Sequence, residues 1–169
     1  ACCGPCSLEP VRLLQAAGHD ITIYYANSNI HPAEEYEHRL ATLRAWAADA
    51  GFEVLEGPYD PATWEACAGR IGDAAIAEVE GARAEAGAES ECASEGASPR
   101  AAVLSVDPAR REARCRACYR LRLEETARVA AEQGFEGIGT TLSVSPYQYT
   151  QVIREEVERA ATQAGVVPV

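Results

Sequence analysis

The chain has 169 residues, and its 26 acidic and 15 basic side chains give a net charge of −11, which does not favour long-range attraction of the whole molecule to nucleic acid. Its 47% apolar and 24% charged residues are ordinary for a globular protein and exclude a fully disordered or fibrous chain. No apolar run approaches the roughly 18 residues of a membrane helix, and no signal peptide is visible. We therefore expect a cytoplasmic protein with no membrane partner.

The first two elements are predicted from local residue types. Ser7 can cap a helix that runs to Gly18, with Pro10 in the first turn, where proline is tolerated. The β-branched and aromatic residues 21–25 predict a buried strand, which ends at the polar loop 27–29. The cysteines near the start of the chain would therefore lie at a helix N-terminus.

A second helix and a second strand are predicted next. Pro32 opens the helix, Gly51 stops it, and apolar residues at helical spacing give it one stripe of Tyr36, Leu40, Leu43 and Ala47. Residues 52–55 predict a short strand, and Asp60-Pro61 begins a third helix.

The composition changes in the middle of the chain. Between residues 78 and 95, six acidic residues and many small ones accompany the single Arg83, and such a segment cannot bury enough apolar surface to order itself. We therefore expect an acidic mobile insertion at about 78–105.

Regular elements resume downstream. A helix is predicted at about 114–133, followed by strand and loop at 135–141. Ser145 should cap a last helix that begins at Pro146, with an apolar face of Val152, Ile153, Val157 and Ala160. Residues 166–169 predict the start of another strand.

The alternation of strands and helices predicts a single α/β domain over residues 1–169, with a parallel sheet and helices on both faces. Loops at the carboxyl ends of parallel strands share one edge of the sheet. Three loops occupy such positions, and we expect them to line one site: 2–6, 27–31 and 140–145. A further strand just before Ala1 would complete the first of these turns, so we expect the start to be trimmed.

The cysteines are the outlier in the composition. Seven is an odd number in a chain without secretory features, which favours metal or redox chemistry over a disulfide framework. Five of them form two tight groups, Cys2, Cys3 and Cys6 near the start and Cys115 and Cys118 downstream. Cys67 and Cys92 fit the plainer interpretation of small buried apolar side chains.

The residues leave three kinds of site open. Cys3-Gly4-Pro5-Cys6 matches a thioredoxin-type redox tetrad at a helix N-terminus. Alternatively, Cys3 and Cys6 could join Cys115 and Cys118 around one zinc ion that staples distant segments. In the third interpretation, vicinal Cys2 and Cys3 ligate an iron–sulfur cluster with the downstream pair, which leaves Cys6 for a second role.

Polar and basic side chains near these cysteines are candidates for substrate contacts. Residues 110–122 contain six arginines, Arg122 among them, and one acidic residue, Glu112. This positive segment could bind phosphate groups of a nucleic acid, or it could be a solvated helix face whose charge is balanced by the acidic insertion. The amides of Asn27 and Asn29 can recognise a heterocycle or sugar edge, or cap a helix. Oxygens of the substrate could be bound by three hydroxyl side chains, Thr140, Thr141 and Ser145, although a helix cap also explains Ser145.

Taken together, these sequence motifs resemble the epoxyqueuosine reductase family of the QueH type. The matching stretches recur in the family's order: Cys2-Cys3-Gly4-Pro5-Cys6-Ser7, Tyr25 to Pro32 with Glu34-Glu35-Tyr36 and Arg39, Arg114 to Leu123, and Thr140 to Gln148. The resemblance implies a Rossmann-like fold of the HUP type. It also implies reduction of the epoxide of the queuosine precursor on tRNA, the last step of queuosine biosynthesis.

The resemblance further implies the roles of the site residues. Cys2, Cys3, Cys115 and Cys118 match the ligands of a [4Fe–4S] cluster, and Cys6 falls where an additional mononuclear iron would be held. The reaction needs an external electron donor, which the sequence does not identify. It also needs a proton donor, for which we expect His31, with Tyr119 as the second candidate. Ser28 stands where the family favours proline. Family members also continue beyond a point like Val169, so we expect the end to be trimmed as well.

Two functions from other classes stay open on the residues alone. One is a zinc-stapled RNA-binding module without catalysis, in which the arginine-rich helix binds the RNA. The other is a thioredoxin-like thiol reductase that uses Cys3 and Cys6.

Overall fold

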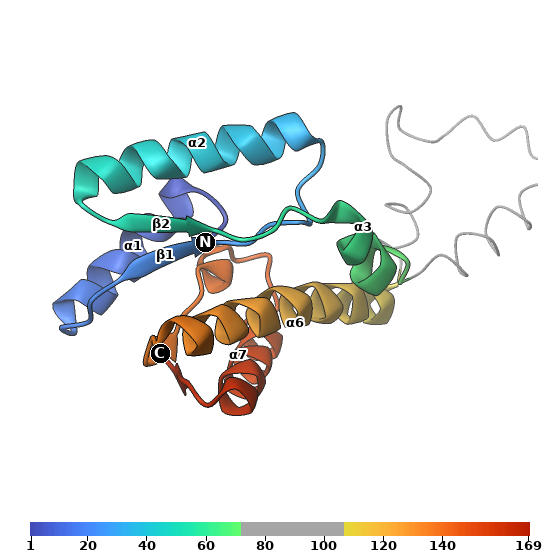
Figure 1. Cartoon of the computed structure of the whole chain (residues 1–169). Coiled ribbons are helices and arrows are strands. Elements are labelled where there is room, and N and C mark those ends of the chain that lie inside the picture. Colours follow the sequence, from blue (N-terminus) through green and yellow to red (C-terminus); the bar gives the residue numbers. More distant parts are fainter. Residues whose placement is uncertain (72–106) are drawn as a thin grey trace, which may run out of the picture.

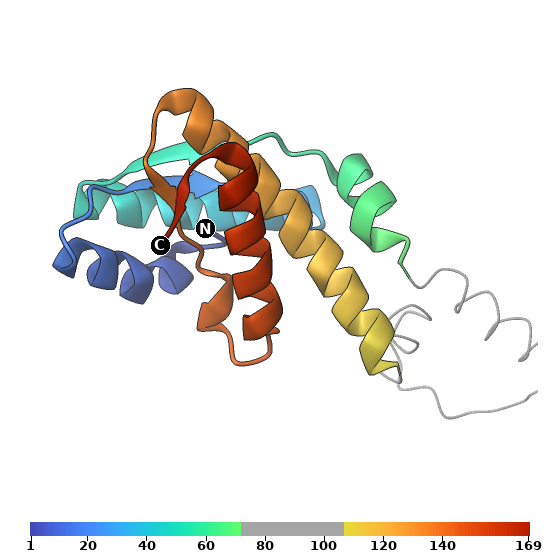
Figure 2. The same cartoon turned by 90° about the horizontal axis from the view of Figure 1, so that it is seen from below.

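The computed structural model of the chain describes residues 1–71 and 107–169, and the expected acidic insertion at 78–105 lies outside this part. Helices and short parallel strands alternate, so the mixed α/β prediction is confirmed. Helix α2 lies on one side of strands β1 and β2, whereas α6 and α7 lie on the other side (Figures 1 and 2). No helix in the described ranges is long and apolar enough to cross a membrane.

The N-terminal half contains α1 (Gly4–Ala16), β1 (Thr22–Tyr25), α2 (Ala33–Ala50) and β2 (Glu53–Glu56). β1 and β2 pair in parallel, with Ile23 opposite Val54. The predicted stripe of α2 is buried in one core with residues of β1 and the following loop, namely Ile23, Tyr25, Ile30, Tyr36, Leu40, Leu43 and Ala47. Gly51 ends α2 in the left-handed conformation (φ 78°), which glycine adopts without steric cost.

A short helical segment follows β2. Helix α3 (Pro61–Trp64) begins as predicted, because the side chain of Asp60 accepts a hydrogen bond from the backbone N–H of Thr63. α3 passes directly into a π-helical turn, η1 (Glu65–Gly69). Trp64, at the junction of these two elements, is buried.

The long helix α6 (Pro108–Gln133) begins before the predicted position 114. It does so because Asp107 accepts hydrogen bonds from the backbone N–H groups of Ala109 and Arg110 and thus caps the helix. The arginine-rich stretch therefore lies wholly within one helix.

The C-terminal half continues with β3 (Gly137–Ile138), a 3₁₀ turn η2 (Leu142–Val144), α7 (Thr150–Ala164) and β4 (Val167–Pro168). The prediction that Ser145 caps a helix beginning at Pro146 is wrong. The backbone oxygen of Ser145 instead accepts a hydrogen bond from the N–H of Gln148, which forms a turn ahead of α7. The predicted apolar face of α7 is buried in a second core, against Tyr119, Leu123, Ala127, Ala130 and Ile138.

The prediction of one Rossmann-like sheet is not confirmed. β1 and β2 form one two-stranded parallel sheet, and β3 and β4 form another. A cavity of about 680 Å³ is lined by Thr22 to Tyr24 on one side and Gly137 to Gly139 on the other, together with Ala1 and Val169. No described residue supplies a strand between β1 and β3, so the two sheets remain separate. The strand expected before Ala1 stays a prediction.

Candidate metal and substrate site

Three cysteine sulfurs meet at the start of α1. Cys3 is the N-cap of this helix and Cys6 lies in its first turn. The sulfur atoms of Cys2, Cys3 and Cys6 all lie within 4.8 Å of one another. α1 begins earlier than the predicted Ser7, whose buried hydroxyl donates instead to the backbone oxygen of Cys3 at 2.9 Å. The sequence prediction that the first cysteine group lies at a helix N-terminus is confirmed.

The three thiols have unequal electrostatic surroundings. Burial alone would raise the pKa of Cys2, but hydrogen bonds from Cys6, Thr141 and Cys3, together with the positive charge of Arg122, outweigh this effect and lower the pKa. Burial raises the pKa of Cys6 to about 12, and its hydrogen bonds to Cys3 and Cys2 act in the same direction. Cys2 is thus prepared to ligate as a thiolate, whereas Cys6 keeps its proton unless a cation displaces it.

The loop after β1 is fastened to this cysteine group by Asn27. Its side chain is fully buried, and Nδ2 donates to the backbone oxygen of Ala1 at 2.7 Å. Arg122 on α6 donates from Nη2 to Asn27 Oδ1 at 2.5 Å and from Nε to the backbone oxygen of Ala26 at 2.9 Å. Asn27 and Arg122, both predicted to contact substrate, therefore have internal partners, and contact with substrate stays a prediction.

The loop after β3 also reaches the cysteines. Thr141 Oγ1 lies 3.9 Å from the sulfur of Cys2, while Thr140 Oγ1 accepts a hydrogen bond from the backbone N–H of Leu142 at 3.2 Å. The Ser145 hydroxyl accepts from the N–H of Tyr147 at 3.4 Å. The expectation that three loops meet at one site is confirmed for Cys2, Asn27 and Thr141.

The second cysteine pair lies on α6. Cys115 and Cys118 are three residues apart, so they share one face of the helix. Cys115 packs against the C-terminal core, and burial raises the pKa of its thiol. Cys118, like Cys115, is partly buried. Neither belongs to the cluster of Cys2, Cys3 and Cys6 within 4.8 Å, so their place as metal ligands stays a prediction.

The two candidate proton donors differ in exposure. His31 is exposed in the loop before α2. Tyr119 is 3% exposed and its hydroxyl donates to Oε1 of Gln148. Burial, reinforced by negative charge at Cys115, raises the pKa of Tyr119 to about 12. Tyr119 therefore holds its proton firmly, which makes it a hydrogen-bond donor and a weak acid.

Asn29 carries an unused acceptor. Its Oδ1 atom is buried and has no hydrogen-bond partner among the described residues. Buried polar atoms nearly always have a partner, so an unpaired oxygen marks a place where the donor group of a ligand would fit. This is the feature that most directly supports one of the predicted substrate contacts.

Trp64 is a site residue that the sequence predictions missed. Its Nε1 donates to the sulfur of Cys118 at 3.3 Å, although the two residues are 54 positions apart. Its ring lies 5.5 Å from that of His31, and the guanidinium carbon of Arg114 lies 5.3 Å from the centre of the ring. No local sequence pattern predicts this contact, because Trp64 belongs to a four-residue helix whose position depends on tertiary packing.

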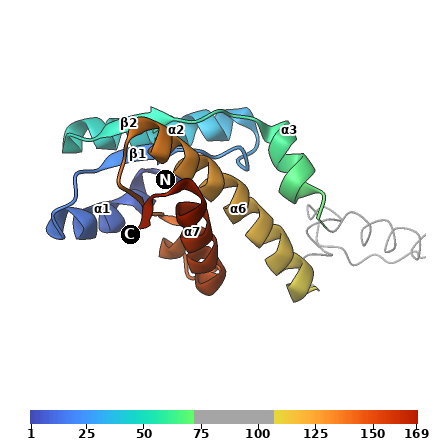
Figure 3. The same ribbon diagram turned by 60° about the horizontal axis from the view of Figure 1, so that its bottom comes forward.

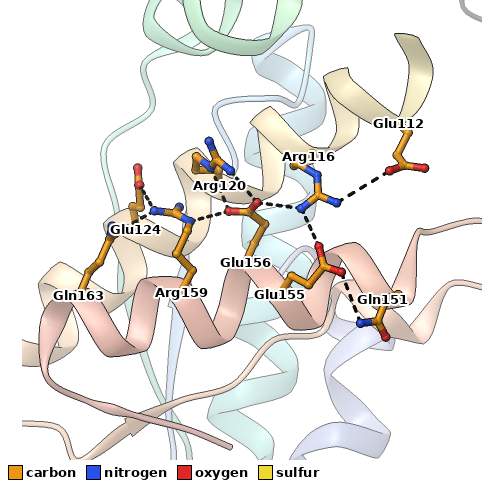
Figure 4. Close-up of polar contacts among 9 residues, drawn as sticks. All are labelled: Glu112, Arg116, Arg120, Glu124, Gln151, Glu155, Glu156, Arg159 and Gln163. Carbon is orange, nitrogen blue, oxygen red and sulfur yellow. Dashed lines mark hydrogen bonds and ion pairs between the residues drawn. The ribbon is translucent and has the colours of Figure 1, made fainter. Parts of the chain in front are cut away.

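Two arginines of the arginine-rich stretch, Arg116 and Arg120, form ion pairs with acidic residues of α7. Figure 4 shows Glu156 of α7 between Arg116, Arg120 and Arg159, with Glu155 also on Arg116. Burial of Glu156 would raise its pKa, but the hydrogen bonds from Arg120 and Arg159 prevail and lower the pKa to about 2. Acidic residues of α7 thus balance Arg116 and Arg120, and the suggested role of the acidic insertion lies outside the described residues.

Two other cysteines lie outside this site. Cys67, in η1, is exposed, so the expectation that it is a small buried side chain is wrong. Cys92 lies outside the described residues.

As a donor set, the three gathered thiols suit soft metals such as zinc and the irons of iron–sulfur clusters. The lowered pKa of Cys2 and the N–H···S hydrogen bond to Cys118 are both features that accompany thiolate ligands. The residues present therefore fit a thiolate-held metal cofactor.

Comparison with known proteins finds one family, by a family model and by curated relatives. The model of the family described as "Epoxyqueuosine reductase QueH" matches residues 1–86 and 94–169. Curated relatives of that name are 29% identical in Staphylococcus aureus (92% of this chain, 53% of the relative), 29% in Streptococcus pyogenes (91% and 49%) and 28% in Dehalococcoides mccartyi (98% and 70%). The chain thus spans about half the length of the first two relatives.

Proposed function

Because the chain belongs to the epoxyqueuosine reductase QueH family, we propose that it provides the metal-binding part of an enzyme that reduces epoxyqueuosine in tRNA to queuosine. In this reaction both carbon–oxygen bonds of the epoxide break, an alkene forms, and the oxygen leaves as water. Two electrons from an external donor and two protons are consumed. The observation that carries the proposal is the gathering of Cys2, Cys3 and Cys6 beside Thr141.

We assign the cofactor to two groups of residues. Cys2, Cys3, Cys115 and Cys118 would hold a [4Fe–4S] cluster, and Cys6 would hold an additional mononuclear iron. When bound, the cluster supplies electrons one at a time and the additional iron supplies Lewis acidity. The lowered pKa of Cys2 supports this assignment, because a thiol must lose its proton before it ligates.

The remaining residues bind the substrate and deliver protons. The unpaired Oδ1 of Asn29 would accept a hydrogen bond from the modified base, and the hydroxyls of Thr140, Thr141 and Ser145 would contact its oxygens. The exposed His31 would supply a proton, because histidine is the side chain that most often acts as a general acid. Tyr119 would donate a hydrogen bond without giving up its proton, in keeping with its pKa of about 12.

The decisive experiment is the iron, zinc and acid-labile sulfide content of anaerobically purified protein, with absorption spectra before and after dithionite. About four irons and four sulfides with a band that bleaches would support the reductase, and iron beyond four would support the site at Cys6. About one zinc without sulfide would favour a stapled RNA-binding module. No metal after reconstitution would favour thiol chemistry at Cys3 and Cys6, which lie close enough for it.

A further inference from the structure

The only polar atom of the Trp64 side chain faces a cysteine of the proposed metal site. The residue is 7% exposed, and its indole N–H points to the sulfur of Cys118 at a donor–acceptor distance of 3.3 Å. Buried tryptophans ordinarily satisfy this N–H with a hydrogen-bond acceptor. Here the acceptor is a sulfur on another helix, so the bond fixes α3 to α6 at the cysteine pair.

The two neighbours of the indole ring come from different parts of the chain. The guanidinium of Arg114, one turn before Cys118 on α6, lies 5.3 Å from the ring centre. A cation over the ring is attracted to its negative face, so this contact helps to hold the indole against α6. The imidazole of His31 lies 5.5 Å away at an interplanar angle of 54°. One side chain thus contacts a candidate proton donor and a candidate metal ligand.

We propose that Trp64 is a positioning residue that raises the reduction potential of the metal centre through its hydrogen bond to Cys118, and that it also sets the place of His31. An N–H donor draws electron density from a ligand sulfur, so that the reduced form of a cluster is favoured. This inference rests on the proposed function, because it requires Cys118 to be a metal ligand.

The first test compares two tryptophan-to-phenylalanine variants. Trp64→Phe keeps an aromatic ring beside His31 and Arg114 but removes the N–H. Trp46→Phe is the matched control, since Trp46 lies on α2 beside Gly4, and among the described residues its indole has no hydrogen bond to a cysteine sulfur, unlike that of Trp64. At equal iron and sulfide content, the midpoint potential from a mediated dithionite titration should become more negative in Trp64→Phe and stay unchanged in Trp46→Phe.

The outcomes separate this inference from the proposed function. A cluster-loaded Trp64→Phe protein with the wild-type potential would overturn the role of Trp64 alone. Wild-type protein that holds neither iron nor sulfide would overturn the proposed function.

A second readout does not need an assembled cluster. In Trp46→Phe protein, Trp64 is the only tryptophan, so its fluorescence reports on Cys118 directly. Titration of the reduced, metal-free protein with cobalt(II), a thiolate-binding ion that quenches nearby indoles, should remove most of this emission. In Trp64→Phe protein, Trp46 lies beside Gly4, between Cys3 and Cys6, so its emission reports on ions bound at the first cysteine group. Quenching of Trp64 that persists unchanged after Cys118→Ala would contradict the proposal.

Discussion

Arg122 and Asn27 meet at 2.5 Å, from Nη2 to Oδ1, and through this contact the middle of α6 is fixed to the loop that follows β1. Nδ2 of the same Asn27 amide donates a hydrogen bond to the backbone oxygen of Ala1. A single buried side chain therefore connects the helix of the second cysteine pair to the segment of the first.

Replacing Asn27 should test this connection. Asn27→Ala removes two hydrogen bonds and leaves a charged donor and a backbone oxygen without their partner, so we expect the free energy of unfolding to fall by about 2 kcal/mol. Urea denaturation measures the change. Asn29→Ala is the control, because its buried Oδ1 has no hydrogen bond to lose. A loss of stability that is equal in the two variants would contradict the structural role of Asn27.

The same Asn29→Ala variant tests substrate recognition. If its free oxygen accepts a hydrogen bond from the modified base, affinity for tRNA that carries epoxyqueuosine should fall by about tenfold, the value of one hydrogen bond of ordinary strength. Filter binding against tRNA without the modification gives the comparison. An equal loss for both tRNAs would mean that Asn29 does not contact the modified base.

Glu156 should make the stability of the protein depend on pH. Its pKa is about 2 in the folded protein, below the ordinary value of about 4.3 in an unfolded chain. The stabilisation it provides is therefore complete above about pH 4.3 and is lost as the pH falls toward 2.

Glu156→Gln measures that contribution. At pH 7 we expect the variant to be less stable by about 2 kcal/mol, since Arg120 and Arg159 lose their shared carboxylate. The difference from the unsubstituted protein should shrink at pH 3. Glu155→Gln, at a more exposed carboxylate of the same helix, should have a smaller effect. A difference that does not depend on pH would refute the lowered pKa of Glu156.

The cysteine assignments make a direct prediction. Cys2→Ala and Cys118→Ala should each lose the cluster iron and the formation of queuosine, because each removes one thiolate ligand. Cys67→Ala removes an exposed thiol in η1 and should leave both unchanged. Iron content and mass spectrometry of tRNA nucleosides are the measurements. Full iron and full activity in either ligand variant would exclude that residue as a ligand.

Local pattern predicted the helices well. The stripe of α2 is buried as its spacing indicates, because helical periodicity alone decides which side chains face the core. The start of α7 was predicted wrongly at Ser145-Pro146, since a serine followed by proline suits a turn as well as a helix cap. Only tertiary contacts distinguish the two, and here Ser145 closes the turn to Gln148.

Contacts between distant segments set the limit of prediction. That the loops of Cys2, Asn27 and Thr141 meet follows from the rule for parallel strands, and the structure confirms it. The bond from Trp64 to Cys118 follows from no such rule, since it depends on how a short helix packs on α6. The division of the sheet likewise depends on what fills the space between β1 and β3.

Helix α6 serves the cysteine pair and the C-terminal core at once. α6 lies beside α7 (Figure 3), and Cys115 and Cys118 belong to the same helix as Leu123 and Ala127, which are buried in the C-terminal core. The amides around the cysteines should therefore open together with those of the core in hydrogen exchange, as one cooperative unit. Any ion bound by these thiols would slow exchange far along α6, so the stability of the C-terminal half and the occupancy of the site are thermodynamically linked.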